Sequence, residues 1–237
     1  MTGLVRKATL LCVGGVLLAG AAMAGVPSPA NSQAPCILLM DMGNSNNGIG
    51  VNAGVCGQPA LKVIVRDANN NPVAGSSVVV DFSTCNATNV KLAQTQDDLA
   101  VTIACTGKTA TKNANGLGEV CFSLIGNTNI NVPGGTPTRN WGPATTFVCA
   151  KIFADGVLLG TKAVAINRYD LDANGVVDAG DGSYHLQAQG EALAANYRTF
   201  GDYNCDGFVD AGDGSLHLQA QGNALAGVTL YTGTYCP

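Results

Sequence analysis

Short runs rich in β-branched and other apolar residues alternate with turn signals over residues 36–167. The clearest run is Leu61–Arg66, in which apolar and polar residues mostly alternate, as expected of a strand with one face in a core and the other in water. No stretch of this region has the longer period of an amphipathic helix. The runs are Ile37–Asp41, Leu61–Asp67, Ser77–Ser83, Leu99–Cys105, Gly118–Ile125, Thr145–Phe153 and Val157–Ile166.

Residues that favour turns separate these runs. They are Asn69–Pro72, Asn113–Gly116, Pro133–Gly135 and Asp155–Gly156. About seven strands in about 130 residues, with short connections, predict a mainly β fold built as a β-sandwich over residues 36–167.

The pattern changes after residue 167, where one stretch occurs twice. Asp170–Gly190 and Asp202–Gly222 align without a gap and differ at only six of 21 positions. Each copy has Asp or Asn at positions 1, 3, 5, 9 and 12 and glycine at position 6. A tight loop of twelve residues with oxygen side chains at those positions, and a backbone carbonyl at position 7, is typical of a calcium site.

The sequence therefore predicts two Ca²⁺ ions, one in each loop. The ligands of the first loop are Asp170, Asp172, Asn174, the Val176 carbonyl, Asp178 and Asp181. Those of the second are Asp202, Asn204, Asp206, the Phe208 carbonyl, Asp210 and Asp213. A helix is expected after each loop, and the two helices are expected to be antiparallel. A small shared core between them is predicted from Val177, Val209, Tyr184, Ala188, Leu216 and Ala220.

The N-terminus has the three parts of a secretory signal peptide. Arg6 and Lys7 precede an apolar run, which ends in Ala22-Met23-Ala24. Residues 1–24 are thus expected to be removed near Ala24, and residues 25–35 to form an exposed leader or linker. The expected location is secreted, extracellular or at the cell surface, with no membrane span in the mature chain.

Eight cysteines remain after such cleavage, and an even number in an exported chain predicts disulfides. Spacing favours Cys36–Cys56 and Cys85–Cys105 as closures of short loops, with Cys121–Cys149 as a third pair. Cys205 lies at a non-ligand position of the second loop, so it is predicted to pair with Cys236 at the chain end.

Charge is distributed unevenly. Residues 168–237 hold nine acidic and two basic side chains, net −7, whereas residues 25–167 hold seven acidic and eight basic, net +1. Divalent cations would neutralise most of the acidic excess. Because phosphate binding needs a basic surface, nucleic acid is excluded as a partner.

The paired loops resemble dockerin repeats, in which each calcium loop is followed by one helix. The resemblance covers residues 168–237 and rests on the ligand positions, on Gly175 and Gly207, and on Asp rather than Glu at position 12. It implies a docking module for a cohesin-like protein or a cell-surface scaffold. Positions 10 and 11, where dockerins usually contact the cohesin, are Ala179-Gly180 and Ala211-Gly212 here. A purely structural use of the module therefore stays open.

A second resemblance covers about half of residues 36–167. The stretch LKVIVRDANNNPVAGSSVVVDFS, followed by NANGLGEVCFSL, looks like the invasin-type bacterial Ig-like domains. The matching positions are Asp67, Asn71, Pro72, Val73, Gly75 and Gly116. This resemblance implies an Ig-like sandwich that acts as a spacer or an adhesive module.

No catalytic motif or nucleotide fingerprint is present, so an enzyme is not expected. His185 and His217, at equivalent helix positions, are predicted to be surface or packing residues rather than zinc ligands. Asp97-Asp98 is predicted to be a solvated turn rather than a glycosidase pair. The leading hypothesis is an exported, non-enzymatic, calcium-binding structural or interaction protein. The alternative is a cohesin-docking, carbohydrate-binding component of a polysaccharide-degrading assembly.

Overall fold

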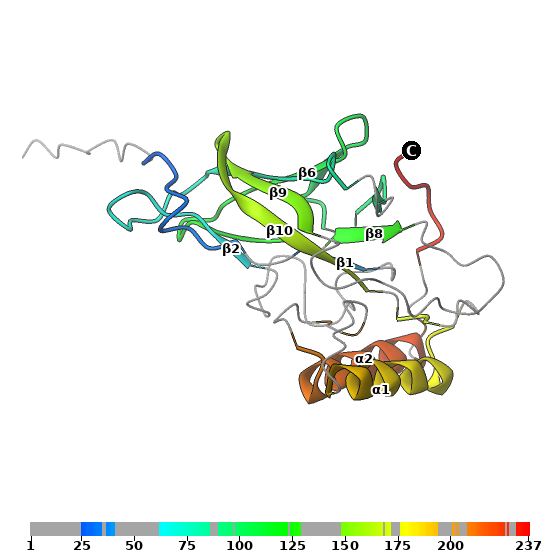
Figure 1. Ribbon diagram of the computed structural model, residues 1–237. Helices are drawn as coiled ribbons and strands as arrows, with labels where there is room; N and C mark the ends of the chain where they lie inside the picture. The colour runs from blue at the N-terminus through cyan, green and yellow to red at the C-terminus, as the bar shows by residue number, and fades with distance from the viewer. Residues whose placement is uncertain are drawn as a thin grey trace, which may run out of the picture.

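The computed structural model shows a mainly β protein with two helices. It describes residues 25–34, 37–40, 62–85, 90–96, 98–122, 124–128, 148–167, 169–171, 176–193, 201, 203, 208–225, 227 and 231–237. Within these residues there are ten strands and two helices, which lie together at one end of the molecule (Figure 1). Neither of these helices is long and apolar enough to cross a membrane.

The larger sheet has eight strands, and its longest strand joins two halves. β10 (Val157–Asn167) pairs antiparallel with β9 (Val148–Ala154) through its first half and parallel with β1 (Ile37–Met40) through its second half. The spatial order is β4 (Val90–Leu92), β8 (Leu124–Thr128), β1, β10, β9, β3 (Ser77–Asp81), β6 (Thr109–Asn113) and β5 (Thr102–Ala104).

A second sheet of two strands shares its core with the first. β2 (Lys62–Ile64) pairs antiparallel with β7 (Glu119–Cys121). Val63 and Val120 from this small sheet belong to the same buried cluster as Val78, Val80 and Ile152 from the large one. Alternation of buried valines with more exposed residues along β3 produces this arrangement, because successive side chains of a strand point to opposite faces.

Six of the seven predicted runs contain one strand each, and the run Gly118–Ile125 contains β7 and the start of β8. The strands β4 and β6 are missing from the prediction. β6 escaped detection because its inward side chains are Ala110 and Lys112 rather than large apolar ones. The predicted turn at Asp98 is not solvated, because its carboxylate is buried and forms an ion pair with Lys112. Lys112 also donates to the Cys121 carbonyl.

Residues 25–34, expected to be an exposed leader, instead lie along the small sheet. Gln33 and Ile64 exchange both backbone hydrogen bonds, at 2.8 and 2.9 Å. Pro27 and Ala34 are buried, and Ala34 joins the main core. The segment is extended and polar enough to resemble a linker, but it satisfies backbone groups of the neighbouring strand.

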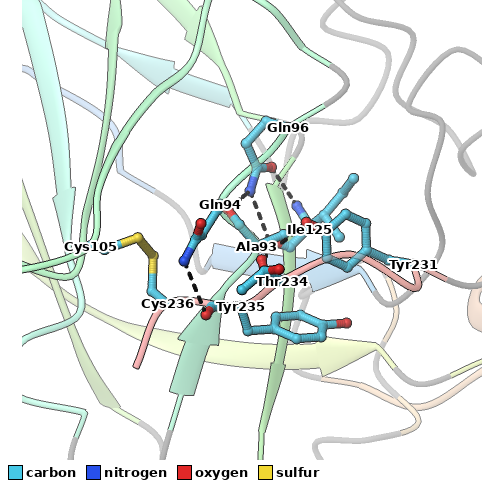
Figure 2. The surroundings of a disulfide bond; sticks show 9 residues. All are labelled: Ala93, Gln94, Gln96, Cys105, Ile125, Tyr231, Thr234, Tyr235 and Cys236. Atoms are coloured by element: carbon cyan, nitrogen blue, oxygen red, sulfur yellow. Dashed lines mark hydrogen bonds between the residues drawn. A yellow bond between two sulfur atoms is a disulfide. The ribbon is translucent and has the colours of Figure 1, made fainter.

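The chain end returns to the large sheet, and the predicted Cys205–Cys236 disulfide is wrong. Cys236 is bonded to Cys105, as Figure 2 shows. The Cys236 N–H donates to the Leu92 carbonyl, and Gln94 N–H donates to the Thr234 carbonyl. The last residues thus extend the sheet beyond β4. Pairing with an open sheet edge satisfies backbone groups that would otherwise need water, which explains why the tail lies here and not on the second loop.

The other short-loop pairings fail for a similar reason. Cys85 is bonded to Cys149, across 64 residues, so Cys85–Cys105 and Cys121–Cys149 are both wrong. Cys149 lies on β9 and is brought to Cys85 by the pairing of β9 with β3. Sheet pairing, not sequence spacing, selects the partners. The predicted pair Cys36–Cys56 lies outside the described residues.

Candidate functional site

Each helix of the repeat begins with the same pair of aspartates. Before α1 (Ala179–Leu193), Asp178 accepts the Gly180 N–H at 2.7 Å. The Asp178 N–H in turn donates to the side chain of Asp181, at 2.8 Å. This reciprocal arrangement is a capping box, with Asp178 at the N-cap and Asp181 three residues later.

The second copy repeats the cap with the same geometry. Before α2 (Ala211–Leu225), Asp210 accepts the Gly212 N–H at 2.7 Å, and Asp213 accepts the Asp210 N–H at 2.9 Å. Loop positions 9 and 12 therefore define the start of both helices. Negative charge at these positions is also favoured by the positive end of the helix dipole.

The aspartate at position 12 also closes the loop. Asp181 accepts the Leu171 N–H at 2.6 Å, and Asp213 accepts the Tyr203 N–H at 2.6 Å. Both carboxylates have no exposed surface. One side chain thus holds position 2 and position 9 of its loop together, and it does so identically in both copies.

Seven of the twelve predicted calcium ligands lie in the described residues. They are Asp170, Val176, Asp178, Asp181, Phe208, Asp210 and Asp213. Asp172, Asn174, Asp202, Asn204 and Asp206 lie outside them. Among the described residues, no three His, Cys, Asp or Glu side chains form a cluster that could hold a metal. A complete site would need the aspartates and asparagines at positions 3 and 5.

The described part of each loop fits the donor chemistry of calcium. Asp170, Asp181 and Asp213 are buried carboxylates, and carboxylate oxygens are ligands that calcium prefers. The side chains of Val176 and Phe208 are 53% and 67% exposed, so position 7 is suited to contribute only its carbonyl. The only basic residues in 168–237 are Arg168 and Arg198, far too few to balance nine acids.

A small aromatic core lies between the helices. The rings of His185 and His217 are parallel, with centroids 5.7 Å apart, and Tyr203 lies 5.1 Å from His185. Tyr169 contacts Tyr203 at a centroid distance of 5.2 Å. Each imidazole reaches the first turn of the opposite helix, beside Gly182 or Gly214. These reciprocal contacts make the helices antiparallel, as predicted.

Burial keeps both imidazoles neutral. His185 is 2% exposed, and burial, assisted by the neighbouring His217, lowers the pKa of His185 to about 4. Burial also lowers the pKa of His217, against an opposing contact with the Asp178 backbone. The prediction of packing residues is confirmed for both histidines.

The predicted small core is partly right. Five of the six predicted residues are buried, and three of these, Val177, Leu216 and Ala220, belong to its apolar cluster. The other two buried residues are Val209 and Ala188, whereas Tyr184 is only half-buried. Tyr169 and Tyr203 were missed. They flank position 1 of their loops on opposite sides: Tyr169 precedes Asp170, and Tyr203 follows Asp202 at position 2 of its loop. A tyrosine beside position 1 of each loop was the available signal.

Comparison of the chain with protein-family models, with curated proteins and with solved structures finds no match. Function therefore has to be inferred from the geometry of the loops and their surroundings.

Proposed function

We propose that the protein is an exported, non-enzymatic, calcium-binding structural or interaction protein. In this proposal an Ig-like β-sandwich is followed by a dockerin-like module that holds two Ca²⁺ ions. Calcium would neutralise the loop carboxylates and fix the helices that begin at positions 9–12, so that metal binding contributes to the folding free energy.

The observation that carries the proposal is the fully buried aspartate at position 12 of each loop. Asp181 and Asp213 have the same two backbone donors to within 0.1 Å, although the loops differ in sequence at positions 2 to 5 and 7. Burying a carboxylate is costly without hydrogen bonds and a counter-charge. The backbone N–H groups supply the hydrogen bonds, and a divalent cation would supply the charge.

The β domain supports the sandwich part of the proposal. Two sheets share one core, and turns at Asp67–Asn71 and Asn115–Glu119 have the same construction. In each turn the first side chain accepts backbone N–H groups two and four residues later. Such rigid turns suit a spacer or adhesive domain.

Both ends of the helical module join the β domain closely. Tyr169, buried in the module core, stands only two positions after the end of β10. Beyond α2, the tail is bonded through Cys236 to Cys105. A module attached at both ends is suited to a fixed structural role, which favours this role over docking through a mobile linker.

Calcium titration of the full mature chain tests the proposal. Isothermal calorimetry should find two ions per chain, with dissociation constants of about 10⁻⁴–10⁻³ M, as for other extracellular modules. Asp172→Asn and Asp206→Asn should each remove one site. Glu191→Gln removes the same charge from the same module outside the loops and should leave both sites intact. If chelator changes neither the helical circular dichroism nor the melting temperature, the calcium proposal is wrong.

A second candidate function is docking to a cohesin-like partner of a polysaccharide-degrading assembly. The observation that favours it is a set of outward-facing leucines repeated on both helices, each at least 66% exposed: Leu186, Leu193, Leu218 and Leu225. Pull-down with cohesins, compared with the double variant Leu186→Ser and Leu218→Ser, tests this function. A glycan array tests the carbohydrate-binding part separately.

A further inference from the structure

The first residues after the predicted cleavage position are fixed to the strand that precedes the Asp67 turn. Ser28 N–H donates to the Arg66 carbonyl at 2.7 Å, and Ser32 Oγ accepts the Arg66 N–H at 3.0 Å. Asn31 Nδ2 donates to the carbonyls of Asp67 and Ala68. In Figure 1 this blue segment runs beside the cyan strand β2 and the turn that follows it.

This path brings Gly25 against the side chain of Asp67. A Cβ atom added at Gly25 would lie 2.6 Å from Asp67 Cβ and 2.7 Å from Asp67 Oδ2. Such distances are too short for real side chains, so only glycine fits at position 25 without a shift of Asp67. The Gly25 nitrogen is bonded to the same Cα, and tetrahedral geometry places it about 2.5 Å from that Cβ position. The nitrogen is therefore at most about 5 Å from the carboxylate.

Hydrogen bonds within the turn favour the carboxylate form of Asp67. Its Oδ1 accepts the N–H groups of Asn69 and Asn71, both at 2.8 Å, and its Oδ2 accepts from Asn71 Nδ2. These bonds, chiefly those from Asn71, hold the pKa of Asp67 below its usual value. Arg66 is the nearest charged residue to Asp67 in the sequence, and it interacts electrostatically with Glu119. Glu119 also forms an ion pair with Lys62. In the described part of the chain, the hydrogen-bond donors to the Asp67 carboxylate are thus amides, and none is a cation.

We propose that the Asp67 turn is a binding site for the new N-terminus, so that signal-peptide cleavage after Ala24 creates an ion pair between the Gly25 α-ammonium and the Asp67 carboxylate. Hydrolysis by a signal peptidase uses one water: its oxygen completes the Ala24 carboxylate, and the Gly25 nitrogen is left as an amine that takes up a proton. Before cleavage this nitrogen is a neutral amide. The proposal rests on the proposed export of the chain.

The pair makes the mature fold sensitive to where the chain starts. An opposite charge within about 4–6 Å favours the charged form of a group, so the pKa of the Gly25 α-amino group should rise above its usual value of about 7.7–8.0. One extra residue would move the charge away from Asp67 and put an amide in its place. Stability gained from the pair is fully present below the unfolded α-amino pKa and is lost as pH rises through the raised folded pKa.

The test uses two purified proteins, one beginning at Gly25 and one beginning at Ala24, each released from a fusion by a site-specific protease. Their α-amino pKa values are measured from the pH dependence of amine labelling. We expect a raised pKa only in the protein that begins at Gly25, and we expect Asp67→Asn to abolish the rise. The asparagine oxygen can still accept the N–H groups of Asn69 and Asn71, which keeps the turn. Asp155→Asn, in a different turn with one backbone donor from Ser77, is the matched control.

Melting gives an independent readout. The protein that begins at Gly25 should melt about 1–3 °C above the one that begins at Ala24 near pH 6, and Asp67→Asn should remove this difference. Equal pKa values and equal melting in both proteins would overturn the ion pair. N-terminal sequencing of the exported protein tests the export step separately. A mature chain that begins elsewhere overturns Gly25 as the processed end, whatever the two purified proteins show.

Discussion

The β domain and the helical module are stabilised in different ways. Among the described residues, the β domain buries a cluster of about twenty apolar residues drawn from both sheets, whereas the apolar cluster of the module has five, with one more at its edge. The module instead buries the carboxylates of Asp170, Asp181 and Asp213. A core as small as this supplies little hydrophobic free energy. We therefore expect the β domain to hold its fold through its own core, and the module to depend on the cations proposed to neutralise its acids.

The β domain and the helical module also differ in net charge. Residues 25–167 are nearly neutral, at net +1, and their buried Asp98 has Lys112 as partner. Residues 168–237 carry net −7 with only two basic residues. The buried acid of the β domain is paired internally, whereas under the calcium proposal the acidic module takes its counter-charge from solution. Chelation should therefore affect hydrogen exchange of α1 and α2 more than that of β3 or β9.

The disulfides Cys105–Cys236 and Cys85–Cys149 offer the largest test of this division. Replacing Cys105 and Cys236 by serine, or Cys85 and Cys149, should each lower the free energy of unfolding by about 2–4 kcal/mol. The loops span 131 and 64 residues, a doubling that changes the closure entropy by only about 0.6 kcal/mol. The two variants should differ in which region of the protein is destabilised. Loss of Cys105–Cys236 frees the exit of the module, whereas loss of Cys85–Cys149 affects the β domain.

Hydrogen exchange measured by mass spectrometry, peptide by peptide, distinguishes these outcomes. Peptides of α1 and α2 should exchange faster in the Cys105/Cys236 variant than in the Cys85/Cys149 variant. The same protection of the helices in both variants would mean that the tail does not restrain the module.

Acidification should weaken the module before the β domain. Burial, with a smaller contribution from the neighbouring His217, lowers the folded pKa of His185 from its usual value of 6.5 to about 4. The stability that depends on its neutral form is complete above about pH 6.5 and is lost as pH falls towards 4. These are the only two histidines of the chain, so the β domain has no such group.

The measurement is the melting of the module at saturating calcium between pH 7 and 4.5. The double variant His185→Phe and His217→Phe keeps two stacked rings without the titration, and it should lose less stability over this range. A pH dependence as steep as that of the original protein would assign the effect to the loop carboxylates instead.

Local patterns predicted the elements but not the long-range partners. β-rich runs between turn signals located β2, β3, β9 and β10, and the repeat located both helices, because these signals lie within a few residues of each other. The partners of Cys85 and Cys236 depend on which strands lie side by side. The parallel pairing of β1 with β10 depends on contacts about 127 residues apart in sequence, such as Ile37 with Val164.

Polar residues with unexpected burial account for the other misses. Lys112 and Asp98 were not predicted to be core residues, because charged side chains are rarely buried unless they are paired. Here both side chains are largely buried and form an ion pair. The capping role of Asp178 and Asp181 could have been read from their spacing and the helix start that follows. The predicted metal ligation and the observed capping involve the same aspartates, so the calcium pattern masked the simpler one.

A smaller effect is expected at a glycine that the β domain requires. Gly118 has φ of 73°, and an added Cβ would lie 2.5 Å from the Val65 carbonyl oxygen. Gly118→Ala should lower the free energy of unfolding by about 1–3 kcal/mol, because it combines a left-handed backbone with a steric clash. Urea denaturation measures the loss. The control is Gly75→Ala, which has the same φ of 73° but open space around the added Cβ. An equal loss in both variants would mean that backbone strain, not the clash, sets the cost.

The same substitution should have the opposite sign in the module. Gly222 lies inside α2 with open space around an added Cβ, and Gly190 is its equivalent in α1. Alanine at either position should stabilise the helix by about 0.5–1 kcal/mol, because glycine loses more backbone entropy on folding. Melting of the module at saturating calcium measures the gain, and calorimetry should find unchanged calcium affinity. If Gly222→Ala destabilised the module, its outer helix face would have to be in contact with another part of the protein, and the small-core description of the module would be wrong.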